Sequence, residues 1–125
     1  MKKRGFLSVW LPALGWAGLI FLLSSFPFAL KVQPSFSFID KWVHFFIYIP
    51  LGFLVSRALY LSEKKVIKKN FIILTLVFCL LYAASDEFHQ LFVRNRQAEI
   101  WDVFFDFFGS GAGLIIFNFF KKRII

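Results

Sequence analysis

Long apolar runs alternate with short polar stretches along the chain. The apolar runs cover about residues 6–28, 38–61, 71–91 and 100–120, and few charged residues interrupt them. A helix needs about 20 apolar residues to cross the hydrocarbon core of a bilayer. Because every run reaches this length, the pattern predicts an all-α membrane protein with four transmembrane helices. The short connections contain no linker or low-complexity tract, so a single domain over residues 1–125 is expected.

The composition supports a lipid environment. Hydrophobic residues make up 59% and aromatic residues 22% of the chain, and the mean hydropathy is +0.71. A soluble domain of 125 residues cannot bury so much apolar side chain. The net charge of +8 would suit nucleic acid, but the basic residues stand in short blocks between the apolar runs, so no such partner is expected. The single cysteine, Cys79, excludes an internal disulfide and a cysteine-based metal site.

The basic residues predict the orientation in the membrane. Eleven of the fifteen Lys and Arg residues lie at the N-terminus, between residues 57 and 69, or in the segment 121–123. Since positively charged loops stay in the cytoplasm, we expect both termini there, in the plasma membrane of a bacterium. A signal peptide also has a basic start, but its apolar core is usually only about 7–15 residues long. An uncleaved first span is therefore expected.

The other ends of the apolar runs carry a mixed group of polar residues. Six of the seven acidic residues and both histidines lie there. Ionisable side chains inside a membrane are costly and usually mark a functional site. Asp86 and Glu87 also stand near a helix C-terminus, where the helix dipole disfavours acids.

Helical spacing places these polar residues on shared faces. Residues four apart lie on one side of a helix, and three such sets occur: Asp40, His44 and Tyr48; Asp86 and Gln90; Asp102 and Asp106. Packed helices run about 8–10 Å apart. The three faces can therefore converge in one polar pocket just under the outer surface.

The pocket residues divide into two predicted roles. Candidates for catalysis can act as a general base or hold a divalent metal, and they are Asp40, His44, Asp86 and Glu87. Candidates for binding offer charge or hydrogen bonds to a ligand, and they are Lys41, Tyr48, His89, Gln90, Arg94, Arg96, Asp102 and Asp106. A divalent metal is a possible cofactor, but no set of metal ligands is assigned. Several residues also have structural explanations, such as snorkelling for Lys41.

Several spaced motifs follow one another over nearly the whole chain. They are Ser24-Ser25-Phe26-Pro27, Asp40-Lys41-x-x-His44-Phe45-x-x-Tyr48, and Asp86-Glu87-x-x-Gln90-x-Phe92 with Arg96, Asp102 and Gly109. Together they resemble the signature of the VanZ-like family, small bacterial membrane proteins named for a member associated with resistance to the glycopeptide teicoplanin. The resemblance implies a role in the cell envelope of the glycopeptide-resistance type.

The chain departs from the family pattern at two places. Arg94-Asn95 stands where the family usually has Pro-Gly, and Asp106 stands where it usually has Asn. The second change adds a charge to the pocket, which argues against a role that needs a neutral amide there.

Three classes of function stay open. The pocket could bind a lipid head group, a lipid-linked wall precursor or an amphiphilic antibiotic, with basic groups meeting phosphate or carboxylate. The protein could instead be a small intramembrane hydrolase or transferase that uses a metal to act on a lipid-linked or phosphorylated substrate, although no HExxH or nucleophile-elbow motif is present. A proton-coupled carrier would need an oligomer. Gly109 and Gly113 have the spacing of a close helix contact and are the expected contact between copies.

Overall fold

The computed structural model describes residues 5–25, 38–92 and 100–124, and all regular structure in these ranges is helical. The helices are α1 (Phe6–Ser25), α2 (Phe38–Tyr60), α3 (Lys65–Lys69), α4 (Phe71–Gln90) and α5 (Ile100–Ile124). All except the short α3 are long and apolar enough to cross a membrane. The prediction of an all-α protein with four spans is confirmed. Residues 65–69, in the polar connection between the second and third apolar runs, form the short helix α3.

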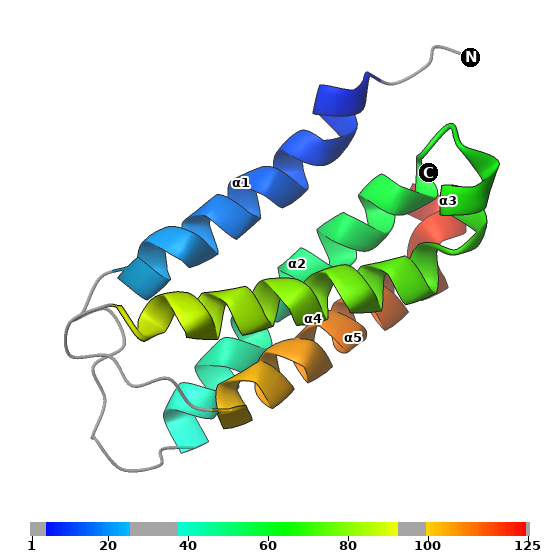
Figure 1. The fold of residues 1–125 in the computed structure, drawn as a ribbon. Coiled ribbons are helices and arrows are strands. Elements are labelled where there is room, and N and C mark those ends of the chain that lie inside the picture. The colour runs from blue at the N-terminus through cyan, green and yellow to red at the C-terminus, as the bar shows by residue number, and fades with distance from the viewer. Residues whose placement is uncertain (1–4, 26–37, 93–99, 125) are drawn as a thin grey trace.

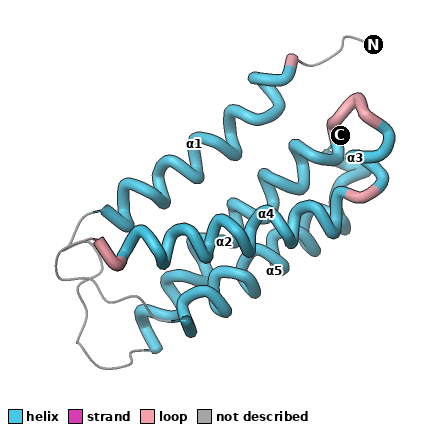
Figure 2. Tube along the Cα trace, viewed as in Figure 1, coloured by secondary structure: helices cyan, strands magenta, loops and turns pink. Residues whose placement is uncertain are grey.

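The helices form an up-and-down bundle. α1 and α4 run in one direction and α2 and α5 in the other, as Figure 1 shows. The beginnings of α2 and α5 therefore lie at the same end of the bundle as the ends of α1 and α4. α3 lies at the opposite end, close to the end of α5 (Figure 2).

Glycines bring α2 and α5 into the closest contact of the bundle. A Cβ atom added at Gly109 would collide with the carbonyl oxygen of Phe45, and one at Gly113 with that of Ile49. Gly52 on α2 meets the backbone of α5 in the same way. Small residues allow such backbone contact between membrane helices. Gly109 and Gly113 therefore face α2 of the same chain, and an oligomer, which stays a prediction, would need a different surface.

Hydrogen bonds to backbone carbonyl groups join α1 to the other helices. The indole Nε1 of Trp16 donates to the carbonyl oxygen of Ile47 on α2 at 2.8 Å. The hydroxyl of Tyr82 on α4 donates to the carbonyl oxygen of Ala17. These bonds fix the rotation of α1 about its axis, so its inner face packs against both α2 and α4.

The bundle has a small core and a largely apolar surface. Its main core cluster consists of Ala13, Ile20, Tyr48, Leu51, Val55, Cys79 and Ala83. On the outside, large side chains such as Phe46, Phe108 and Phe119 are 61%, 62% and 79% exposed. A continuous apolar surface of this kind is stable against lipid rather than water. Together with the lengths of the helices, it identifies a multi-pass membrane protein.

Basic side chains gather at the end of the bundle that contains α3. The ammonium groups of Lys68 and Lys121 lie 4.9 and 5.1 Å from the centroid of the Tyr60 ring. These contacts bring the end of α2, α3 and the end of α5 together. The tertiary structure thus assembles most of the basic blocks of the sequence at one end.

Candidate functional site

The opposite end of the bundle contains a buried group of polar side chains. It lies where α2 and α5 begin and α4 ends (Figure 1). Each member is at most 6% exposed, and the members are Lys41, His44, Tyr48, Asp86, Glu87, Gln90, Asp102 and Asp106. We call these eight residues the polar cluster.

A salt bridge between α2 and α5 forms one side of the polar cluster. The Nζ atom of Lys41 lies 2.7 Å from Oδ1 of Asp102, and the two side chains are 1% and 4% exposed. Lys41 therefore does not extend to the membrane surface. Its charge compensates a buried carboxylate instead, as buried ions require.

The imidazole of His44 lies between the two acids of α5. Its Nδ1 atom is 2.9 Å from Oδ1 of Asp106, and its Nε2 atom is 3.7 Å from Oδ2 of Asp102. An ionised carboxylate can only accept hydrogen bonds, so Nδ1 is the donor whenever Asp106 is ionised. The two acids are one turn apart on α5, and this spacing lets a single imidazole from α2 meet both.

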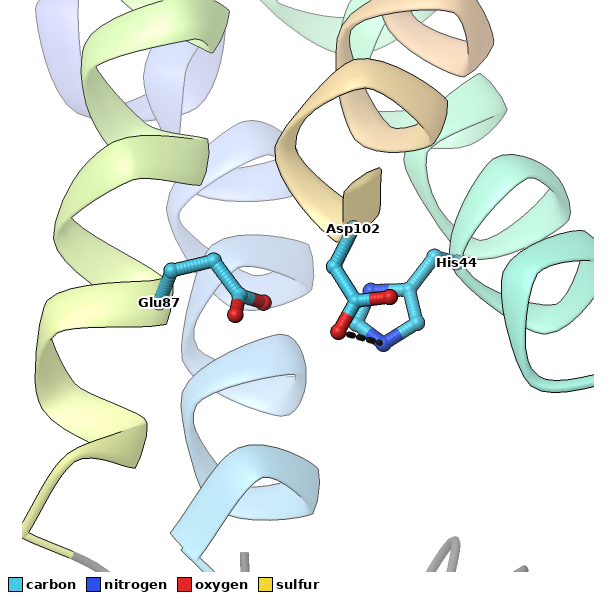
Figure 3. Close-up of side chains that lie close together, drawn as sticks. All are labelled: His44, Glu87 and Asp102. Atoms are coloured by element: carbon cyan, nitrogen blue, oxygen red, sulfur yellow. Dashed lines mark ion pairs between the residues drawn. The ribbon is translucent and has the colours of Figure 1, made fainter. Parts of the chain in front are cut away.

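Acidic side chains of α4 complete the polar cluster. Figure 3 shows the carboxylate of Glu87 pointing from α4 toward Asp102 and His44. One possible ligand atom from each of these three residues lies within 4.8 Å of the other two. The carboxylates of Asp86, Glu87 and Asp106 form a second group with the same spacing. The cluster thus contains four acids, from α4 and α5, and one lysine, from α2.

A small cavity of about 20 Å³ adjoins the polar cluster between α1, α2 and α4. Its lining residues are Ile20, Leu23, Ser24, His44, Ile47, Tyr48, Asp86 and Gln90. This volume is enough for about one water molecule. The hydroxyl of Tyr48 is buried and has no hydrogen-bond partner within the described ranges. The cavity is therefore lined by both apolar and polar side chains, and a larger group can bind only if the surrounding helices move.

The structure brings together most of the side chains that the sequence predicted for the site. Those found in the polar cluster are Lys41, His44, Tyr48, Asp86, Glu87, Gln90, Asp102 and Asp106. The side chain of Asp40 and the whole of Arg94 and Arg96 lie outside the part of the chain that the structure describes. The individual roles of all these residues in catalysis or binding stay predictions.

His89 points away from the polar cluster. Its Nε2 atom lies 3.0 Å from the hydroxyl oxygen of Ser25, and its ring stacks on Phe21 at a centroid distance of 4.6 Å. His89 follows Glu87 by two positions, which turns it about 200° around the axis of α4. It therefore belongs to the contact between α1 and α4.

The sequence analysis did not assign a site role to Ser24. This serine is 5% exposed and lines the cavity opposite Asp86 and Gln90. The sequence contained a hint, because two adjacent serines stand near the end of the first apolar run, at the same end of the bundle as the acids. Only the packing of α1 against α4 shows which of the two serines reaches the cavity.

Comparison with known proteins identifies a family. A profile of the VanZ/LLP1 family matches residues 9–121, whereas no curated protein and no solved structure matches the chain. The matched range includes every residue of the polar cluster and nearly all of the four long helices. This agrees with the resemblance found in the spaced motifs. The chain therefore belongs to the VanZ/LLP1 family.

Proposed function

We propose that this protein acts in the bacterial cell envelope as a protein of the teicoplanin-resistance type. In this proposal its polar cluster binds an amphiphile. The amphiphile is a membrane lipid, a lipid-linked wall precursor or an amphiphilic antibiotic, bound through its polar group. The observation that carries the proposal is the burial of a lysine, a histidine and four acids between three membrane-spanning helices. Such groups are costly in a bilayer and are retained where they bind something.

The charge of the polar cluster defines the chemistry that it recognises. The four carboxylates outnumber the ammonium of Lys41, which is already bonded to Asp102. Carboxylates accept hydrogen bonds, so the cluster suits amines and hydroxyls of the ligand. Arg94 and Arg96 follow α4 in the sequence and would meet a phosphate or carboxylate of the same ligand. An amphiphile that carries both an amine and an acidic group fits this combination.

In this proposal, movement of α1 gives a ligand access to the polar cluster. The cavity lies between Ser24 on α1 and Asp86 on α4, and at about 20 Å³ it is too small for a head group. A shift of α1 away from α4 would enlarge it from the side of the surrounding lipid. The acyl chains of a bound amphiphile would then stay in the bilayer while its head reaches the acids.

The proposed orientation puts the polar cluster near the outer face of the plasma membrane. The basic end with α3 lies in the cytoplasm in this arrangement, in agreement with the positive-inside rule. Wall precursors and glycopeptides would then meet the cluster on the side where the cell wall is built.

Native mass spectrometry of the purified protein tests the proposal. We expect wild type to retain one amphiphile per chain, and the charge-removing variants Asp86→Asn and Arg96→Ala to lose it. Asp86→Asn keeps the volume of the side chain, so a lost ligand reports on charge. Lys68→Ala, at the exposed basic end, is the matched control and retains the ligand. Equal retention by wild type and both charge-removing variants would refute the proposal.

The mass of the retained molecule separates the three possible amphiphiles. A second measurement is the minimum inhibitory concentration of teicoplanin for cells that express the protein. We expect wild type and Lys68→Ala to raise it and Asp86→Asn to leave it at the level of cells without the protein. The inhibitory concentrations can be compared only if all variants are similarly abundant in the membrane, which an immunoblot checks.

A further inference from the structure

The polar cluster contains a group of atoms with the spacing of metal ligands. Nitrogen of His44 and carboxylate oxygens of Glu87 and Asp102 lie within 4.8 Å of one another, and all three side chains are buried. Figure 3 shows them converging from α2, α4 and α5. The group therefore offers an imidazole nitrogen in addition to two carboxylates, and is not an acidic cluster alone.

The hydrogen bond of His44 prepares its Nε2 atom for a metal. Nδ1 lies 2.9 Å from Oδ1 of Asp106, and in the neutral tautomer that donates there the lone pair is on Nε2. Metal-binding histidines usually donate their other ring N–H to a carboxylate in this way. Nε2 lies 3.7 Å from Oδ2 of Asp102, which is too long for a hydrogen bond. Two ligands of one tetrahedral ion stand about 3.4 Å apart when the metal–ligand bonds are about 2.1 Å long.

An unsatisfied carboxylate oxygen is a second, independent indication of a cation. Asp106 is fully buried, and its Oδ2 atom has no hydrogen-bond partner in the ranges that the structure describes. Its carboxylate lies within 4.8 Å of those of Asp86 and Glu87. Burying three carboxylates side by side is costly unless positive charge compensates them. Lys41 lies 2.7 Å from Asp102, and a bound cation would add positive charge beside Asp106.

We infer that the polar cluster binds a divalent transition-metal ion, such as Zn²⁺ or Mn²⁺, through His44 Nε2, Glu87 and Asp102. Asp106 orients the imidazole through Nδ1, and Asp86 adds negative charge beside the ion. One nitrogen and two oxygen ligands suit Zn²⁺ or Mn²⁺ better than Cu(I), which prefers thiolates and thioethers. Lys41 stays on Oδ1 of Asp102, so the metal uses the other carboxylate oxygen.

The alternative is a protonated His44 that forms salt bridges with both acids of α5. The two arrangements differ in what the protein binds. The metal site takes up an ion stoichiometrically and loses it when Glu87 is neutralised. The salt-bridge arrangement needs no ion, and Glu87→Gln does not change its metal content.

Metal analysis of the purified protein in detergent tests the inference. The protein is stripped with a chelator, incubated with Zn²⁺ or Mn²⁺, dialysed and measured by elemental analysis and titration calorimetry. We expect wild type to retain one ion per chain, and His44→Gln and Glu87→Gln to retain none. Asp106→Asn should bind about 10–100-fold more weakly, as is usual when the carboxylate partner of a ligating histidine is lost. His89→Gln, which changes a histidine of the α1–α4 contact, and Glu63→Gln, at the exposed opposite end, should bind like wild type.

Two outcomes overturn the inference. In the first, wild type retains no more metal than Glu87→Gln. In the second, X-ray absorption of the loaded wild type shows no imidazole nitrogen on the metal. This spectrum needs only wild type, so the test remains decisive if His44→Gln does not fold. Because no amphiphile is added, metal binding succeeds or fails independently of the proposed function.

Discussion

Burial makes the charge of Lys41 depend on an acidic partner. The side chains of Lys41 and Asp102 are almost completely buried, and their charged atoms are 2.7 Å apart. A buried pair contributes little net stability, because removing two ions from water costs about as much as their attraction returns. Removal of one partner is different, since the remaining ion is left without compensation.

Replacement of Lys41 by Met should therefore destabilise the protein by about 3–5 kcal/mol. The apolar side chain leaves Asp102 charged and buried next to Asp106. The free energy of unfolding, measured by denaturant titration in mixed micelles, checks this value. The double variant Lys41→Met/Asp102→Leu should recover most of the loss, because it removes both charges. Lys64→Met, at an exposed position, is the control. If Lys41→Met is as stable as wild type, the salt bridge is not present as described.

Among the helices, the α2–α5 pair holds the polar cluster together. Gly109 and Gly113 on α5 and Gly52 on α2 let the two backbones touch. This contact sets the rotation of α5, and the rotation turns Asp102 and Asp106 toward α2 and α4. Helices in lipid associate by close packing rather than by a hydrophobic driving force. Loss of the close contact should therefore affect the site as well as the fold.

Alanine at Gly113 tests this contact, with Gly111→Ala as the matched control. A Cβ at Gly113 meets the carbonyl oxygen of Ile49, whereas a Cβ at Gly111 has nothing within 4 Å. Gly113→Ala should destabilise the protein by about 1–3 kcal/mol, as overpacking does. Gly111→Ala should be neutral or stabilising by up to about 1 kcal/mol, because alanine favours a helix. The measurement is the free energy of unfolding of each variant. Equal values for Gly113→Ala and Gly111→Ala would contradict the described packing.

The whole molecule is polarised along the axis of the bundle. One end carries exposed basic residues around α3, and the other carries the buried polar cluster. Positively charged segments remain on the cytoplasmic side during insertion. The proposed orientation follows from this difference between the two ends.

Labelling of single cysteines with a membrane-impermeant maleimide tests the orientation. Ser62→Cys, next to the basic end, should react only after the cells are lysed. Gln97→Cys, in the segment between α4 and α5, should react in intact cells. Wild type is the control, since its only cysteine, Cys79, is 0% exposed and should take up no label. The reverse labelling pattern would place the polar cluster at the cytoplasmic face.

The sequence by itself determined the all-helical class, the four spans and the family. It also determined that costly polar groups gather at one end of the bundle. These features depend on how single segments partition between lipid and water, which hydropathy and charge describe without knowledge of neighbouring segments. The i, i+4 spacing of Asp102 and Asp106 likewise placed both acids on one face before any partner was known.

Only the tertiary structure decided which side chains meet. The rotation of each helix about its axis depends on packing against all its neighbours, and hydropathy along one segment does not encode it. This rotation turned His89 toward Ser25 on α1 and turned Gly109 and Gly113 against α2. It also paired Lys41 with Asp102 and directed Glu87 toward His44. These contacts join residues of separate helices, and the relative position of the helices creates them.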